Sequence, residues 1–177
     1  MDKIHFAGID LEFVQGNIVN QPDLDAIVNA ANAELRTGGG VAGAIHRAAG
    51  PGLEKETRPL APISPGDSVI TGGHKLENQF VIHTLGPVYG VDKPEAELLA
   101  ECYKNSLRIA EENEVESLGF PAISAGAFGY PIQEAAKISL KTVKEEADNL
   151  KSVKLIRFLL FSAKDYEVYS ETAEVVF

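Results

Sequence analysis

Two glycine-rich segments carry the clearest chemical signal in this sequence. The first is RTGGGVAGAIHRAAG, residues 36–50, in which three consecutive glycines lead into a helical pattern. The second is SAGAFGYP, residues 124–131. Each follows a strand pattern and precedes a helix, where free N–H groups and the helix dipole favour a negative ligand. Glycine also lets a ligand approach the main-chain amides closely. One such loop could be only a tight turn, but two in equivalent positions indicate a shared anion.

The charge of the chain limits how an anion could be bound. The 177 residues include 16 basic and 26 acidic side chains, for a formal net charge of -10. The basic residues are scattered, so we expect no nucleic-acid partner held by charge neutralisation. An anion would instead be bound locally, by backbone amides or a helix N-terminus.

Cysteine content and hydropathy indicate the compartment. The single cysteine, Cys102, cannot form an internal disulfide. The sequence contains no apolar run long enough for a signal peptide or a membrane span. We therefore expect a cytoplasmic protein with no membrane partner.

Several common sites are excluded by their motifs. Gly38, Gly40 and Gly43 match G-x-G-x-x-G, but the segment AANAELRT separates them from the preceding strand, and no acid ends a following strand. No Lys-Ser/Thr follows the glycines, which excludes a phosphate-binding P-loop. Ser124 lacks the first glycine of a nucleophile elbow, so its hydroxyl and amide are expected to bind ligand or to cap a helix.

The histidines give no sign of metal chemistry. His5, His46, His74 and His83 have no ligand-like spacing, and we expect neither a metal nor a cofactor. His83, in VIHTLG, is interpreted as a core or strand-end histidine.

Three asparagines and two aromatics each have two interpretations. Asn29 and Asn32, in VNAAN, are either turn formers or readers of sugar hydroxyls, because an amide both donates and accepts. Asn17, in QGNI, is a turn residue or, if a nucleotide binds, a reader of the base edge. Phe128 and Phe161 are either core residues or platforms for a ligand.

The elements that must position these residues follow from hydrophobic patterning. Strand-length apolar runs occupy residues 3–6, 11–15, 26–29, 68–71, 80–84, 117–122 and 155–161. Helical periodicity starts near residues 41, 94, 136 and 165. The alternation predicts one domain over residues 1–177, a three-layer α/β/α sandwich around a mixed, mostly parallel sheet of six to seven strands. In such sheets ligands bind where loops leave the strand ends.

Taken together, the motifs resemble the macro domain, an ADP-ribose-binding module. The segments QGNIVNQPDLDAIVNAAN, GGGVAGAIHRAAGP, VIHTLGP and FPAISAGAFGYP occur in the order and spacing of that family. The chain is most similar to the subgroup that removes mono-ADP-ribose from proteins or deacetylates O-acetyl-ADP-ribose.

This resemblance implies a role for each candidate residue. The two glycine loops would hold the diphosphate of ADP-ribose, with no lysine or arginine required. The loop residues concerned are Gly38, Gly39, Gly40, Val41, Ser124, Ala125, Gly126, Ala127 and Phe128. Asn32 would orient the distal ribose beside Phe128, as the two residues that serve catalysis, with Asn29 also on the ligand. Adenine would lie over Phe161, with its edge read by Asn17 and the Ile18 amide.

Three positions depart from the family pattern. Asn17 stands where the family usually has Asp, so its carbonyl oxygen would have to accept from the adenine amine. Ser162 follows the adenine aromatic where many members have Asp or Asn. Ala42 stands where similar hydrolases often have an Asp that is thought to activate water. General-base assistance contributes about 10²–10⁴-fold to a rate, so its loss would slow hydrolysis but need not abolish it.

Other active members share GGGVAGA, and in them the diphosphate of the ligand is proposed to position the water. The resemblance thus implies a hydrolase acting on ester-linked ADP-ribose, with ADP-ribose and ADP-ribosylated proteins as its partners. The alternatives are a reader module without turnover and an ADP-ribose 1''-phosphate phosphatase.

Overall fold

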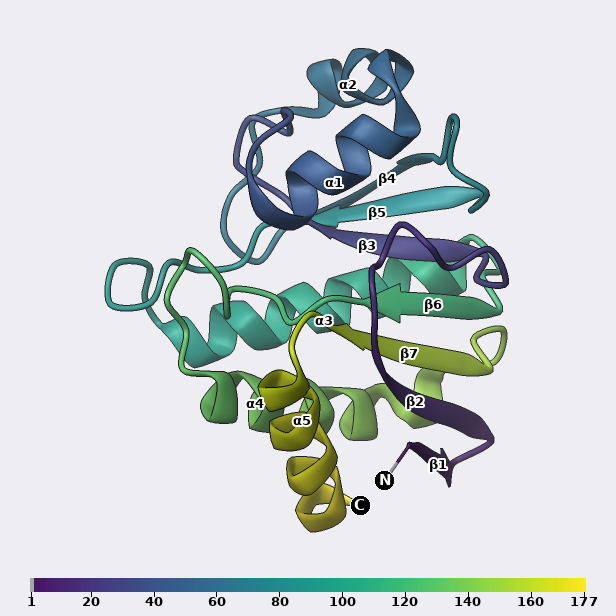
Figure 1. Ribbon diagram of the computed structural model, residues 1–177, viewed down its shortest axis with the longest axis vertical. Helices are drawn as coiled ribbons and strands as arrows, with labels where there is room; N and C mark the ends of the chain where they lie inside the picture. Colours follow the sequence, from purple (N-terminus) through teal and green to yellow (C-terminus); the bar gives the residue numbers. More distant parts are fainter. Residues whose placement is uncertain (1) are drawn as a thin grey trace.

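The computed structural model describes residues 2–177, and seven strands form one sheet in it (Figure 1). The strands are β1 (Lys3–Phe6), β2 (Ile9–Gln15), β3 (Ala26–Ala30), β4 (Ser68–Gly72), β5 (Phe80–Thr84), β6 (Ser117–Phe120) and β7 (Leu155–Leu160). Their order across the sheet is β1-β2-β7-β6-β3-β5-β4. The five central strands are parallel, and β1 and β4 pair antiparallel at the two edges. The predicted mixed, mostly parallel sheet is confirmed.

Helices cover both faces of this sheet. They are α1 (Gly40–Ala49), α2 (Pro51–Thr57), α3 (Glu95–Glu112), α4 (Ile132–Glu146) and α5 (Ala163–Val176), with 3₁₀ turns at Arg58–Leu60 and Ala147–Asn149. Apolar residues of α1 and α2 pack on one face, and those of α3, α4 and α5 pack on the other. The fold is therefore the expected three-layer α/β/α sandwich.

The strand sequences explain why both faces are covered. In β3, Ile27 packs in the cluster that contains Ile45 of α1, whereas the neighbouring Val28 packs in the cluster that contains Leu99 of α3. Successive side chains of a strand point to opposite faces, so a run without polar residues needs a helix on each side.

One helix was not predicted. The segment after Gly50 holds α2, which starts with Pro51 at its first position and whose Thr57 hydroxyl donates to the Leu35 carbonyl at 2.8 Å. The short helix has few apolar positions, so periodicity misses it; Pro51 at the first helical position is the signal that marks it. Within residues 2–177 no helix combines the length and apolar character needed to cross a membrane.

Candidate functional site

Five loops meet at one edge of the sheet. Because β2, β7, β6, β3 and β5 are adjacent and parallel, their carboxyl ends lie together (Figure 1). The loop after β3 contains the first glycine segment, and the loop after β6 contains the second. Asn17 follows β2 and Phe161 follows β7. The topology thus brings all the predicted site residues to the edge where open α/β sheets bind ligands.

Loop 1, residues 32–39, is shaped by Asn32. Its side-chain Nδ2 donates to the Arg36 carbonyl at 2.8 Å, and its Oδ1 accepts from the Arg36 N–H at 2.9 Å. The turn-forming interpretation of this residue is therefore correct. The same side chain lies against Gly38, since a Cβ there would be 3.1 Å from Nδ2. Asn32 consequently lies beside the glycine run. One lone pair of its Oδ1 and one N–H of its Nδ2 are not used by these two hydrogen bonds.

The start of α1 leaves its amides open. Gly39 caps the helix without a side-chain hydrogen bond, and the first turn has no acidic residue. Gly43 donates to the Gly39 carbonyl at 3.2 Å. The N–H groups of Gly40, Val41 and Ala42 precede that first bond, as at any helix start. They point a partial positive charge out of the helix end.

Loop 2, residues 124–129, has a similar arrangement of amides. Its internal hydrogen bonds are donated by Ala125, Gly129 and Tyr130. The N–H groups of Gly126, Ala127 and Phe128 have no acceptor within residues 2–177. Ser124 has a φ of 64°, and its buried Oγ has no partner in the same part of the chain. This second row of open donors matches the first.

The glycines of the two loops and their neighbours fall into two groups, those required by close packing and those that border open space. A Cβ on Gly43 would collide with the Gly38 carbonyl, and one on Gly86 would collide with the Ser124 side chain, so these two are required by packing. Gly39 and Gly126 differ, because a Cβ on either would meet nothing within 4 Å and neither has positive φ. Neither the backbone nor the packing of the protein explains glycine there. The protein leaves open space beside Gly39 and Gly126 that a ligand can occupy.

Phe128 joins the two loops. It packs in a cluster with Ala31 and Leu35, which belong to the segment after β3. Its carbonyl accepts from the Tyr89 N–H at 2.9 Å, which fastens the loop after β5 as well. Phe128 is thus half-buried and connects the loops. Its position is compatible with both interpretations, a core residue and a platform for a ligand.

A buried polar chain supports the site from inside the sheet. Asn29 is 1% exposed and faces His83 on the neighbouring strand, with Asn29 Nδ2 3.0 Å from His83 Nδ1. His83 Nε2 lies 2.9 Å from the Thr71 hydroxyl. Burial, with a smaller contribution from the nearby His46, lowers the pKa of His83 to about 3. The prediction of a core histidine is confirmed, and Asn29 lies beneath the site and does not face solvent.

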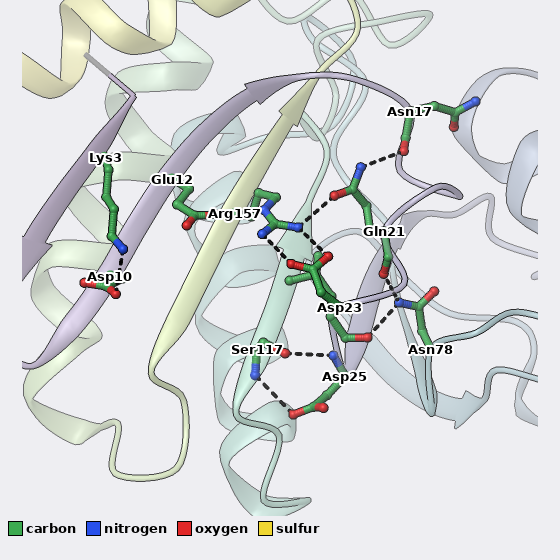
Figure 2. Close-up of polar contacts among 11 residues, drawn as sticks. Lys3, Asp10, Glu12, Asn17, Gln21, Asp23, Asp25, Asn78, Ser117 and Arg157 are labelled. Carbon is green, nitrogen blue, oxygen red and sulfur yellow. Dashed lines mark hydrogen bonds and ion pairs between the residues drawn. The ribbon is translucent and has the colours of Figure 1, made fainter.

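A second polar cluster fixes the loop after β2 (Figure 2). Arg157 of β7 is 12% exposed at its side chain and donates to Glu12, Gln21 and Asp23 at 2.7–2.9 Å. Gln21 in turn donates to the Asn17 carbonyl at 3.0 Å. Asn17 itself is exposed, Ile18 is buried beside Leu159, and Phe161 is 90% exposed. Sequence reasoning missed this cluster because its members are far apart in the chain.

Comparison with known proteins agrees with this geometry. The family model described as Macro domain matches residues 28–139. The chain belongs to the macro domain family.

Relatives share most of this macro domain. A macro domain-containing protein of Caldanaerobacter subterraneus subsp. tengcongensis is 44% identical over 169 residues, which cover 93% of this chain and 95% of the relative. The human ADP-ribose glycohydrolase MACROD2 is 46% identical over 152 residues, which cover 84% of this chain and 36% of that protein.

Solved structures share the fold. The Oceanobacillus iheyensis macrodomain with ADP has a TM-score of 0.92 and 40% identity, covering 98% of this chain and 95% of that one. The Trypanosoma brucei macrodomain in complex with ADP-ribose has a TM-score of 0.84 and 34% identity, covering 91% and 68%.

The departures from the macro domain pattern have local explanations. Ser162 is the N-cap of α5 and accepts from the Asp165 N–H at 3.1 Å, so its hydroxyl serves the helix. Ala42 is buried in the first turn of α1 and presents only a methyl group.

Cys102 is buried, and burial raises the pKa of its thiol to about 11. In the described part of this macro domain no three His, Cys, Asp or Glu side chains are grouped to hold a metal ion.

Proposed function

We propose that this protein binds ADP-ribose and hydrolyses ester-linked ADP-ribose derivatives. The substrates are mono-ADP-ribosyl groups on Asp or Glu of proteins, or O-acetyl-ADP-ribose. One water is consumed, and ADP-ribose and a carboxylic acid are released. The observation that carries the proposal is the pair of glycine loops, which combine N–H groups that have no acceptor within residues 2–177 with two glycines, Gly39 and Gly126, that border open space.

Binding follows from the chemistry of those loops. A diphosphate placed between them would accept hydrogen bonds from the amides at the start of α1 and from Gly126, Ala127 and Phe128. Bonds of an N–H to an ionised acceptor are roughly twice as strong as neutral ones. The dipole of α1 adds a favourable term at the same place. This mode suits a chain with a net charge of -10, because it requires no basic side chain.

Catalysis would depend on position more than on proton transfer. Ala42 cannot take a proton, so the water would be held by the diphosphate of the ligand itself. Asn32 and Phe128 would align the distal ribose, since both stand at the glycine loops. The missing base also favours a second candidate, a reader that binds ADP-ribose without turnover.

Binding is tested with one substitution in loop 2 and a matched control. Gly126→Val would fill the open space without strain, because its φ is not positive and no atom lies near. Affinity for ADP-ribose by titration calorimetry should fall by at least about tenfold, while the free energy of unfolding changes by about 0.5 kcal/mol or less. Gly72→Val, in β4 where a Cβ would meet only ordinary contacts, should leave the affinity unchanged. Absence of any binding by the parent protein would refute the proposal.

Turnover is tested by release of label from a Glu/Asp-linked ADP-ribosylated protein. We expect slow release that requires Asn32, with Asn32→Ala reducing the rate more than the affinity for ADP-ribose. Tight binding with no release at high protein concentration would leave the reader as the function.

A further inference from the structure

A pair of tyrosines lies directly beside loop 2. The Tyr89 N–H donates to the Phe128 carbonyl at 2.9 Å, and the Tyr130 N–H donates to the Ser124 carbonyl at 2.9 Å. The loop after β5 and loop 2 lie at the end of the sheet where α3 and α4 begin (Figure 1). The two rings form an edge-to-face pair, with their centroids 4.9 Å apart. The pair is therefore fixed to the loop that would hold the diphosphate and the distal ribose.

Tyr89 and Tyr130 line an open pocket, which we call the tyrosine pocket. Its volume is about 690 Å³, and its charged lining residues are Lys93, Glu95 and Glu134. Tyr89 is 40% exposed, so part of its ring is open to a partner. Tyr130 is only 4% exposed, yet its hydroxyl has no hydrogen-bond partner within residues 2–177. A pocket of this size can hold a segment of a peptide, and the hydroxyl offers that segment a polar contact.

The charges of the tyrosine pocket are mainly negative. Glu95 lies in the first turn of α3 and Glu134 in the first turn of α4, where they offset the positive ends of both helix dipoles. Neither carboxylate has an ion-pair partner within residues 2–177, although Lys93 lines the same pocket. Burial raises the pKa of Tyr130, and the negative charges of Glu134 and Glu95 add a smaller effect of the same sign. The two carboxylates thus act on the Tyr130 hydroxyl and remain available to a cation.

The place of this pocket indicates which part of a substrate it meets. We propose that the tyrosine pocket binds a lysine or arginine side chain of the ADP-ribosylated protein, next to the modified Asp or Glu. The inference rests on the proposed function, in which the distal ribose lies beside Phe128 and carries the ester to the protein. Because the Phe128 carbonyl is bonded to Tyr89, the pocket adjoins the part of the site from which the attached chain would leave. The preferred substrates are therefore modified residues with a basic neighbour.

The groups of the tyrosine pocket match a cationic side chain. An ammonium or guanidinium group is a donor only, and it can donate to the carboxylates of Glu95 and Glu134 and to the hydroxyl oxygen of Tyr130. The open part of the Tyr89 ring attracts a cation through its π face. An acidic side chain would be repelled, and a neutral one would gain less. Free ADP-ribose carries no such side chain, so the preference concerns only the protein part of the substrate.

The experiment compares three peptides that each carry one ADP-ribosyl group through an amide, which replaces the ester and prevents turnover during the titration. The two residues on either side of the modified position are lysine in the first peptide, glutamine in the second and glutamate in the third. Titration calorimetry at one fixed salt concentration gives the three Kd values. The parent protein should bind the lysine peptide at least about fivefold more tightly than the glutamine peptide, and the glutamate peptide more weakly than either.

Two variants locate the preference in the tyrosine pocket. Glu95→Gln/Glu134→Gln should reduce the ratio of the glutamine-peptide and lysine-peptide Kd values to about twofold or less. Tyr89→Leu should reduce this ratio in part, and leucine keeps the main-chain hydrogen bond to loop 2. Glu97→Gln/Glu101→Gln is the matched control, because both glutamates are exposed on α3 outside the pocket and the same two charges are removed. Its ratio of Kd values should equal that of the parent.

The outcomes separate this inference from the proposed function. Binding of free ADP-ribose together with equal Kd values for the three peptides, or with the glutamate peptide bound most tightly, overturns the inference alone. A lysine preference that is unchanged in Glu95→Gln/Glu134→Gln also overturns it, because the preference would then come from the net charge of the chain. A parent protein that binds neither free ADP-ribose nor any of the peptides refutes the proposed function, and this inference with it.

Discussion

His83 shows how a single buried residue can set the response of the protein to pH. Asn29 Nδ2 is 3.0 Å from His83 Nδ1, which must accept because the amide nitrogen donates. The proton of the neutral ring is therefore on Nε2, where it is donated to the Thr71 hydroxyl at 2.9 Å. A second proton, placed on Nδ1, would make the ring N–H and the Asn29 amide two donors that face each other inside the sheet. Burial is the main cause of the low pKa of His83, about 3, and the geometry offers a second ring proton no acceptor.

The consequence is a loss of stability in mild acid. Above the unfolded-state pKa of about 6.5 the ring is neutral in both states, and its contribution to stability is complete. As the pH falls from there toward 3, only the unfolded chain binds the proton. The free energy of unfolding should fall by about 1.4 kcal/mol for each pH unit in this interval. The pKa of the nearby His46 is also lowered, because the effect of burial exceeds the opposing effect of Glu54. His46 therefore adds to the slope with the same sign.

The test is urea unfolding of the parent and His83→Gln at several pH values between 7 and 4.5. Glutamine can accept from Asn29 and donate to Thr71, so the variant keeps the chain of bonds without the titration. Its pH slope should be shallower than that of the parent. Equal slopes would show that His83 does not titrate in this way.

At the scale of elements, Arg157 is one of the side chains that hold the crossover from β2 to β3 to the sheet, together with Asn78. Arg157 bonds two carboxylates and Gln21, and its hydrogen bond is the main cause of the lowered pKa of Asp23. Removing the guanidinium would leave Glu12 and Asp23 facing each other without a cation. Breaking a largely buried ion pair is far more damaging than breaking an exposed one.

We therefore expect Arg157→Met to lower the free energy of unfolding by about 2 kcal/mol, measured by urea denaturation. Arg108→Met is the control, because the Arg108–Glu112 pair on α3 is exposed and should contribute about 0.5 kcal/mol or less. Similar losses for both arginine variants would argue against a special role for the cluster.

The strands, loops and helices also differ in how well the sequence predicts them. Period-2 and near-continuous apolar runs located all seven strands, because burial on both faces leaves a strong signal. The glycine loops were found because special backbone freedom is visible in residue type. The His83–Asn29 contact was not, because it depends on β3 pairing with β5, and residues 54 positions apart become neighbours only through that register. The Arg157 cluster was missed for the same reason, and α2 was missed because a two-turn helix shows little periodicity.

For the whole molecule, the net charge of -10 decides how affinity should depend on salt. A site built from lysines and arginines loses affinity as salt rises, because counterions compete with the phosphates. Here the donors are main-chain amides at short range, where screening has little effect, while the remaining charges of the protein repel the ligand at long range. The two effects act at different distances, so added salt removes the repulsion and leaves the hydrogen bonds.

ADP-ribose should therefore bind about twofold more tightly as salt is raised from about 20 to 300 mM, since the screening length shortens well below the size of the protein over that range. Titration calorimetry at four salt concentrations measures this trend. Adenosine, which lacks the diphosphate, is the control and should show little change. A steep fall in affinity for ADP-ribose would mean that basic side chains hold the diphosphate. The glycine loops would then shape the pocket but contribute little to anion binding.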